Sequence, residues 1–147
     1  MKRFTFLSIA FLLVFSLLAG CNQQEDFNFD WDGSIQTLQE KGLVIDQTFT
    51  TEAELTDANR LFNEQHRVRG GKVSLEIKRA VVMLMHGDLG NNCQIIEFAN
   101  KKQAEDYTKY YIATRDKDNI HRIATDGSYV VITTLEIVKE TLNIDFK

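Results

Sequence analysis

The segment that decides the fold runs from Lys72 to Ala99 and reads KVSLEIKRAVVMLMHGDLGNNCQIIEFA. Apolar residues alternate along residues 72–86, which predicts a long strand. The alternation changes parity around residues 78–79, and such a change indicates a bulge or a bend. Residues 87–92 (GDLGNN) are typical of a turn, and the largely apolar residues 93–99 follow as a second strand. This segment therefore predicts two adjoining strands at the centre of a sheet.

Capping motifs predict helices on either side of these strands. Thr51 and Glu54 have the spacing of a capping box, which opens a helix that we expect to reach about His66. Asn100 and Gln103 form a second capping pair, and the helix that follows is expected to end near Thr114. The other expected elements are a helix at 34–41 capped by Ser34, a strand at 43–49, strands at 120–124 and 129–133 around an Asp126-Gly127 hairpin turn, and a final helix with Leu135, Val138 and Leu142 on its apolar face.

The order of these elements predicts an α+β domain with an antiparallel sheet and helices packed on one face. The succession of strand, helix, two strands, helix and strand is compatible with the split βαβ, ferredoxin-like plan, with an extra hairpin strand. A chain of 147 residues allows one ordinary domain, which we place at residues 31–147. Its 44% hydrophobic and 26% charged residues exclude wholesale disorder.

Residues 1–20 have the composition of a signal peptide. Lys2 and Arg3 precede a mostly apolar stretch, Phe4–Leu18, and the small residues Ala19 and Gly20 follow. At about 1.5 Å per residue this stretch is about 22 Å long as a helix, shorter than the roughly 30 Å of bilayer hydrocarbon. We therefore expect a cleaved signal, with an uncleaved membrane anchor as the alternative.

The sequence Leu18-Ala19-Gly20-Cys21 resembles the lipobox of bacterial lipoproteins. The resemblance covers this motif and the signal before it. It implies that the Cys21 thiol takes a diacylglyceryl group through a thioether and that a signal peptidase then cuts before Cys21. A mature chain of 127 of the 147 residues would follow, anchored by lipid on the extracytoplasmic face of the cell membrane. An ordinary signal peptide with a coincidental cysteine is the alternative.

Residues 21–30 are interpreted as the lipidated cysteine and a short, mostly polar tether. Phe27, Phe29 and Trp31 alternate at the end of this segment. We expect them to pack on the domain, because aspartates flank them and an anionic surface would repel those carboxylates. Insertion of the three rings into the lipid interface is the alternative.

The charge of the chain limits its partners. Removing Lys2 and Arg3 with the signal leaves 15 of 17 basic residues against 21 acidic ones, a formal net charge of −6. Bulk electrostatics therefore does not favour nucleic acid, and the expected partners are the membrane, through Cys21, and an unidentified protein or small molecule. One local excess of positive charge is a candidate patch for an anionic partner: Arg67, Arg69, Lys72, Lys78 and Arg79.

A search for chemistry finds no GxSxG, HExxH, P-loop, GxGxxG or CxxC motif in the sequence. We therefore predict no catalytic residue, cofactor or metal site, and a small binding or interaction domain. One alternative is a small envelope enzyme that uses scattered residues such as Cys93 with His86 as its base. Another is a structural or inhibitory partner in an envelope complex.

The lipid assignment makes a direct prediction. Cys21→Ser removes the thiol nucleophile, so metabolic labelling with a fatty-acid analogue should fall to background and the precursor should keep its full mass. Cys93→Ser is the matched control and should label like the unaltered chain. Label retained in Cys21→Ser would exclude the assignment.

Overall fold

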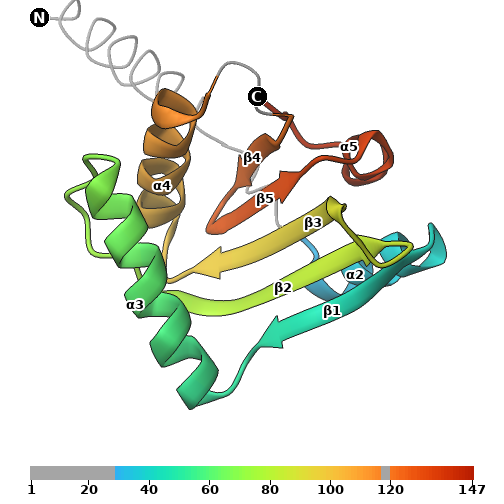
Figure 1. Cartoon of the computed structure of the whole chain (residues 1–147), viewed down its shortest axis with the longest axis horizontal. Coiled ribbons are helices and arrows are strands. Elements are labelled where there is room, and N and C mark those ends of the chain that lie inside the picture. The colour runs from blue at the N-terminus through green and yellow to red at the C-terminus, as the bar shows by residue number, and fades with distance from the viewer. Residues whose placement is uncertain (1–28, 117–119) are drawn as a thin grey trace, which may run out of the picture.

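The computed structural model describes residues 29–116 and 120–147, which form a five-stranded antiparallel sheet and four helices (Figure 1). The expected signal peptide and Cys21 lie outside the described residues. The elements follow one another along the chain as α2 (Trp31–Glu40), β1 (Leu43–Phe49), α3 (Glu52–Val68), β2 (Ile77–Met85), β3 (Asp88–Phe98), α4 (Lys101–Thr114), β4 (Arg122–Asp126), β5 (Tyr129–Thr133) and α5 (Glu136–Leu142).

The strands lie in the order β1-β2-β3-β5-β4, and every neighbouring pair is antiparallel. This confirms the α+β class and the antiparallel sheet. It differs from the ferredoxin-like plan, in which the first strand lies beside the second strand of the central hairpin and not beside the first. Here β1 pairs with β2, the first strand of the hairpin, and the connection through α3 begins and ends at the same end of the sheet, because Phe49 at the end of β1 lies opposite Ala80 near the start of β2.

The central hairpin has the predicted irregularity. The register of β2 against β3 shifts between Ile77 and Arg79, which confirms the bulge expected from the change of parity. The strand itself begins only at Ile77, and residues 72–76 lie outside it. The predicted turn at 87–92 is also shorter. His86 and Gly87 carry the positive φ angles, and β3 begins directly at Asp88.

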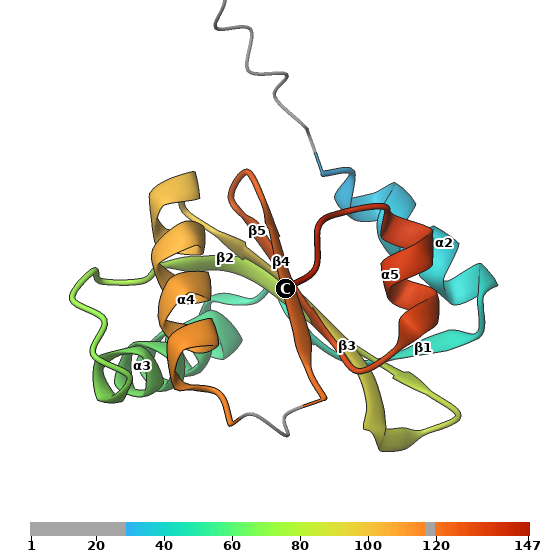
Figure 2. The same cartoon turned by 90° about the horizontal axis from the view of Figure 1, so that it is seen from above.

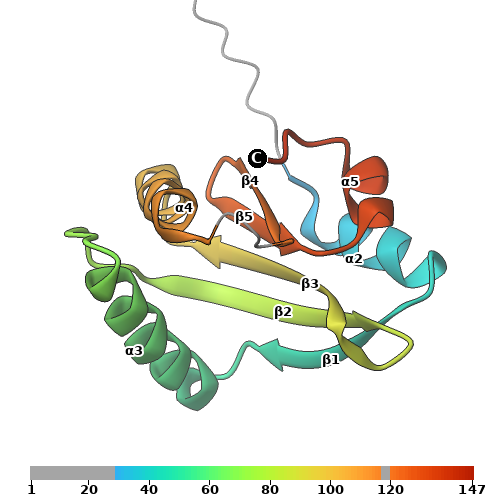
Figure 3. The same cartoon turned by 45° about the horizontal axis from the view of Figure 1, so that its top comes forward.

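Helices cover both faces of the sheet, which corrects the expectation of one covered face (Figures 2 and 3). Helices α3 and α4 pack on one face against Ile77, Ile96 and Ile132, among others. Helices α2 and α5 pack on the other face against a core that includes Val81 and Ile95. The physical reason is that consecutive residues of β2, β3 and β5 are apolar, so each face presents a hydrophobic surface that needs cover.

Two asparagines of α3 hold the chain that leads into β2. Asn63 Nδ2 donates to Leu75 O at 2.8 Å, and Leu75 N donates to Asn63 Oδ1 at 2.8 Å. One turn earlier, Asn59 Nδ2 donates to Ile77 O at 3.3 Å and Asn59 Oδ1 accepts from Ile77 N at 2.6 Å. Each amide thus pairs with both backbone groups of a buried residue, as a neighbouring strand would do.

The domain begins before the predicted boundary at residue 31. Phe29 and Trp31 are 7% and 9% exposed, and both rings contact Tyr129, with centroids 4.9 and 6.2 Å away. Asp30 caps α2 by accepting a hydrogen bond from Gly33 N. Packing on the domain is therefore confirmed for Phe29 and Trp31, while Phe27 lies outside the described residues. In the part of the chain that the structure describes, no helix has the length and hydropathy to span a bilayer.

The hydrogen bonds of Asn63 predict that its substitution by alanine destabilises the domain. Asn63→Ala leaves the buried N–H and C=O of Leu75 without partners, so the free energy of unfolding should fall by about 1–3 kcal/mol. Urea denaturation measures it. Gln65→Ala, on the exposed side of the same helix, is the matched control and should lie within about 0.5 kcal/mol of the unaltered chain. Equal stabilities for the two variants would contradict the role given to Asn63.

Candidate functional site

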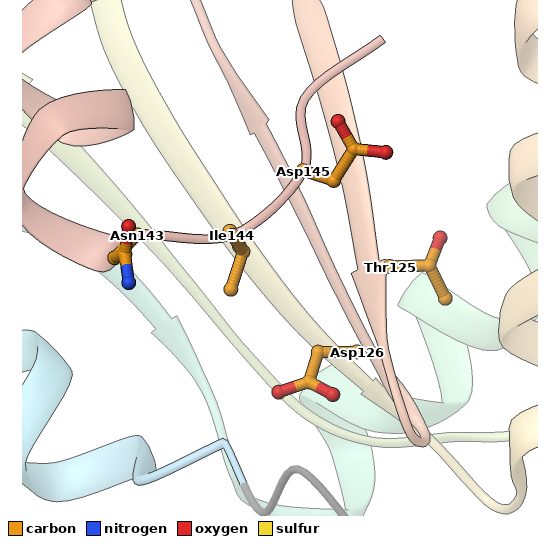
Figure 4. Close-up of a pocket in the computed structure, with 5 residues that line it drawn as sticks. All are labelled: Thr125, Asp126, Asn143, Ile144 and Asp145. Atoms are coloured by element: carbon orange, nitrogen blue, oxygen red, sulfur yellow. The ribbon is translucent and has the colours of Figure 1, made fainter.

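A cleft of about 180 Å³ lies between β4 and the chain that follows α5 (Figure 4). Thr125 and Asp126 of β4 line one side, and Asn143, Ile144 and Asp145 line the other. The segment that forms the second wall begins at Asn143, directly after α5. Asn143 has the left-handed conformation, with a φ of 49°. Residues 143–147 are called the tail below.

The tail is attached to the edge of the sheet beyond the cleft. Lys147 N donates to Ile123 O at 2.9 Å, and Ile123 N donates to Lys147 O at 3.2 Å. Arg115 Nη1 strengthens this attachment by donating to Lys147 O at 2.9 Å. Ile144 and Phe146 pack against the core beneath α2 and α5. The tail is thus held at both ends, and the cleft lies where it stands away from β4.

The edge of β4 presents backbone groups to this cleft. The N–H and C=O of Ile123 point outward, because both bond to the tail rather than to β5. Backbone direction alternates along a strand, so the N–H and C=O of Thr125 point outward as well. The Thr125 hydroxyl lies 2.6 Å from the hydroxyl of Thr108 in α4, which ties this strand to the helix. The cleft therefore contains a backbone donor and acceptor side by side.

Asp126 places a shielded carboxylate oxygen at the cleft. Its Oδ2 atom is buried and has no hydrogen-bond partner among the described residues. Burial raises the pKa of this carboxyl, and the positive charge of Lys101 acts in the opposite direction. Lys101 also pairs with Glu105, with 3.7 Å between Nζ and Oε1. Asp145 on the other wall is exposed and acidic, and its carboxylate points away from that of Asp126 (Figure 4).

The structure places the candidate nucleophile, Cys93, in the core. Its side chain is completely buried, and burial raises the pKa of the thiol to about 12. A hydrogen bond with Thr133 lowers that pKa only in part. His86, the proposed base, is exposed in the turn that follows β2. A thiol with this pKa is not ionised near neutral pH, so the geometry gives no support to a reaction at Cys93.

The five basic residues of the predicted patch differ in their exposure and in their contacts. Arg79 lies over the ring of Trp31 at 4.3 Å, on the side of the sheet that α2 covers, and it pairs with Glu97 at 2.5 Å. Lys78 pairs with Glu76 at 2.5 Å. These two cations are thus engaged by neighbours on the domain itself.

The other three basic residues lie at the end of α3 and in the loop after it. Arg69 packs over the ring of Tyr111 at 4.9 Å, and its charge acts to lower the raised pKa of Tyr107. Arg67 and Lys72 are exposed. Together with Lys78, they are the three exposed members of the predicted patch.

The contact between the buried His66 and Asp106 was not evident from the sequence. His66 is 1% exposed, and its Nε2 lies 2.9 Å from Oδ2 of Asp106, so the pair links α3 to α4. A Cβ atom on Gly71 would lie only 2.1 Å from the same nitrogen, which explains a glycine there. The three histidines lie apart, and the described residues hold no group of three or more metal-ligating side chains. His66 thus has a structural role.

The cleft residues were also missed from the sequence. Asp126 was interpreted only as a turn residue, and Asp145 follows the last predicted helix. Neither residue belongs to a motif, and 19 positions separate them. Their proximity arises because the tail returns to β4, and no local pattern in the sequence indicates such a return.

Comparison with known proteins adds no relative. The chain matches no family model, no curated protein and no solved structure. The function must therefore be argued from the residues themselves.

The raised pKa of Asp126 predicts that substitution by asparagine stabilises the domain, and that the gain depends on pH. A raised pKa means that folding disfavours ionised Asp126, so the domain loses stability as pH rises above the ordinary pKa of aspartate, and the loss is complete once pH exceeds the pKa in the folded state. Asp126→Asn should therefore raise the melting temperature at pH 7. The difference should disappear as the pH falls below about 3.9, the ordinary value for aspartate.

Differential scanning fluorimetry across that pH range measures the effect. Asp145→Asn is the matched control, because it removes an exposed carboxylate from the same cleft and should give no comparable gain. A melting temperature lowered at pH 7 by Asp126→Asn would contradict the interpretation.

Proposed function

We propose that this chain is a bacterial membrane lipoprotein whose folded domain binds a partner on the extracytoplasmic side of the cell membrane. The observation that carries the proposal is the Leu18–Cys21 motif at the end of an apolar segment that begins with two basic residues. Two acyl chains on one residue give stable attachment, where a single chain binds only marginally. The membrane is thus the first partner, and Cys21 is the point of attachment.

The start of the domain gives the anchor a short reach. Phe29 packs in the core, and seven residues separate it from Cys21. Fully extended, this connection spans at most about 30 Å. The domain would therefore stay beside the bilayer and act on molecules within the envelope.

Binding rather than catalysis is favoured by the groups that the domain presents. The cleft between β4 and the tail combines the outward-facing backbone edge of Thr125 with two acidic side chains, Asp126 and Asp145, which favours a polar, positively charged partner. The alternative that relies on Cys93 needs an accessible thiolate, and this thiol is buried with a raised pKa. The negative net charge also disfavours anionic partners.

Localisation tests the proposal in intact cells. The full chain should sediment with membranes, and protease added to spheroplasts or protoplasts should degrade it. A chain that lacks residues 2–20 is the matched control: it should remain in the soluble cytosolic fraction and be protected from the protease. Full-length protein found soluble and protected would contradict the proposal.

A further inference from the structure

We propose that the loop after α3 is a docking surface for anionic phospholipid headgroups, through which the anchored domain rests on its own bilayer. This inference rests on the proposed membrane anchoring and names the part of the domain that meets the lipid. It depends on three exposed residues at the end of α3 and in the chain that follows: Arg67, Val68 and Lys72. Residues 67–73 are called the basic loop below.

The positive charge of the basic loop is not neutralised by neighbours. Residues 65–75 contain no aspartate or glutamate. Arg67 and Lys72 form no ion pair within the part of the chain that the structure describes. The acidic residues on either side, Glu64 and Glu76, pair with other cations. The charges of the basic loop are therefore available to an anionic partner.

An exposed apolar side chain lies among these charges. Val68 is 87% exposed, the largest fraction for any large hydrophobic residue that the structure describes. Arg67 and Arg69 flank it in the sequence. At a membrane surface, cations meet the lipid phosphates while apolar side chains enter the boundary between headgroups and acyl chains. A free phosphate ion would engage the cations alone, so Val68 favours a lipid surface.

The basic loop protrudes from the domain in a conformation that several contacts hold. The connection from α3 to β2 lies at the margin of the domain in Figures 1 and 2, where a flat surface can reach it. Gly71 N donates to His66 O at 2.9 Å, and His66 bonds to Asp106 of α4 at 2.9 Å. Arg69 lies over the ring of Tyr111, also in α4, at 4.9 Å. Because these contacts order the loop beforehand, docking on a bilayer costs little additional conformational entropy.

Tethering makes a local patch effective on an acidic chain. A mature chain with 15 basic and 21 acidic residues would not be recruited to an anionic surface from solution. Anchored at Cys21, the domain begins at most about 30 Å from the bilayer, so contact is an intramolecular event at high effective concentration. Each Lys or Arg near an anionic surface then raises the ratio of contacting to free domains about fivefold.

Lipidated full-length protein in lipid nanodiscs tests the inference, with the methyl NMR signals of Val68 and Leu89 as reporters. The nanodiscs carry a headgroup spin label and contain phosphatidylcholine alone or with phosphatidylglycerol. Phosphatidylglycerol should increase the broadening of the Val68 signals several-fold. Leu89, 75% exposed beside the turn between β2 and β3, is the internal control and should respond little. Equal broadening of Val68 in the two lipids would overturn the inference.

Neutral variants assign the contacts. Arg67→Gln and Lys72→Gln each remove one positive charge, so the ratio of contacting to free domains should fall about fivefold in each. Lys41→Gln, which removes an exposed charge between α2 and β1, is the matched control and should leave the contact unchanged. All three positions are exposed, and melting temperatures check that the variants are folded. Unchanged contact in both Arg67→Gln and Lys72→Gln would overturn the inference.

Inorganic phosphate distinguishes a lipid surface from a site for a free anion. Added to the full-length protein in uncharged detergent micelles at constant ionic strength, it should cause no saturable shift in the amide signals of Arg67 and Lys72. A saturable shift would assign the loop to free anions and overturn the lipid surface.

The two proposals fail distinguishably, because mass spectrometry of the same preparation shows whether Cys21 carries lipid. Lipidated protein without a contact that depends on phosphatidylglycerol would end the inference and leave the anchoring intact. Protein without lipid would contradict the proposed function and, with it, the tether on which this inference depends.

Discussion

The constraint on which this domain depends is the burial of both faces of its three central strands. Strands β2, β3 and β5 carry apolar residues at successive positions, so neither face of the sheet tolerates water. Two pairs of helices meet this need, α3 with α4 on one face and α2 with α5 on the other. The second pair draws the two ends of the domain together, because Phe29 and Phe146 belong to the same core. The position of the tail beside β4 follows from this closure.

The sequence predicted the features that depend on residues close together in the chain. It did not predict the contacts between residues that lie far apart in the chain. The Thr51 capping box, the helix that begins after Asn100 and the parity change in β2 were all confirmed, because each depends on residues within a few positions. The same parity change contained a second signal, since apolar residues on both parities also indicate a strand buried on two faces. Its interpretation as a bend alone led to the expectation of one covered face. The pairs His66–Asp106 and Asn59–Ile77 span 40 and 18 positions, beyond any local pattern.

Residue type proved a poor guide to chemistry because position decides whether a group can react or bind. The cysteine with apparent nucleophilic potential lies in the core, where burial suppresses its ionisation. Arg79 and Arg69, which suggested an anionic partner, pack over the aromatic rings of Trp31 and Tyr111. In both cases neighbouring side chains of the fold engage the group: Cys93 is completely buried, and the two arginines are partly covered by the rings. Conversely, Asp126 belongs to no motif, yet one of its carboxylate oxygens is buried without a hydrogen-bond partner among residues 29–116 and 120–147.

The two edges of the sheet explain why the candidate site lies at β4. An edge strand offers unpaired backbone groups, and proteins protect such edges with bulges, charges or a covering segment. On β1, the register shift between Ile45 and Gln47 makes Asp46 an extra residue, so a bulge and a charge interrupt this edge. On β4 the protection is the tail, which pairs with Ile123 and then stands away at Thr125. Protection of β4 is therefore incomplete where the carboxylate of Asp126 is nearest, and recognition there would use backbone pairing and charge together.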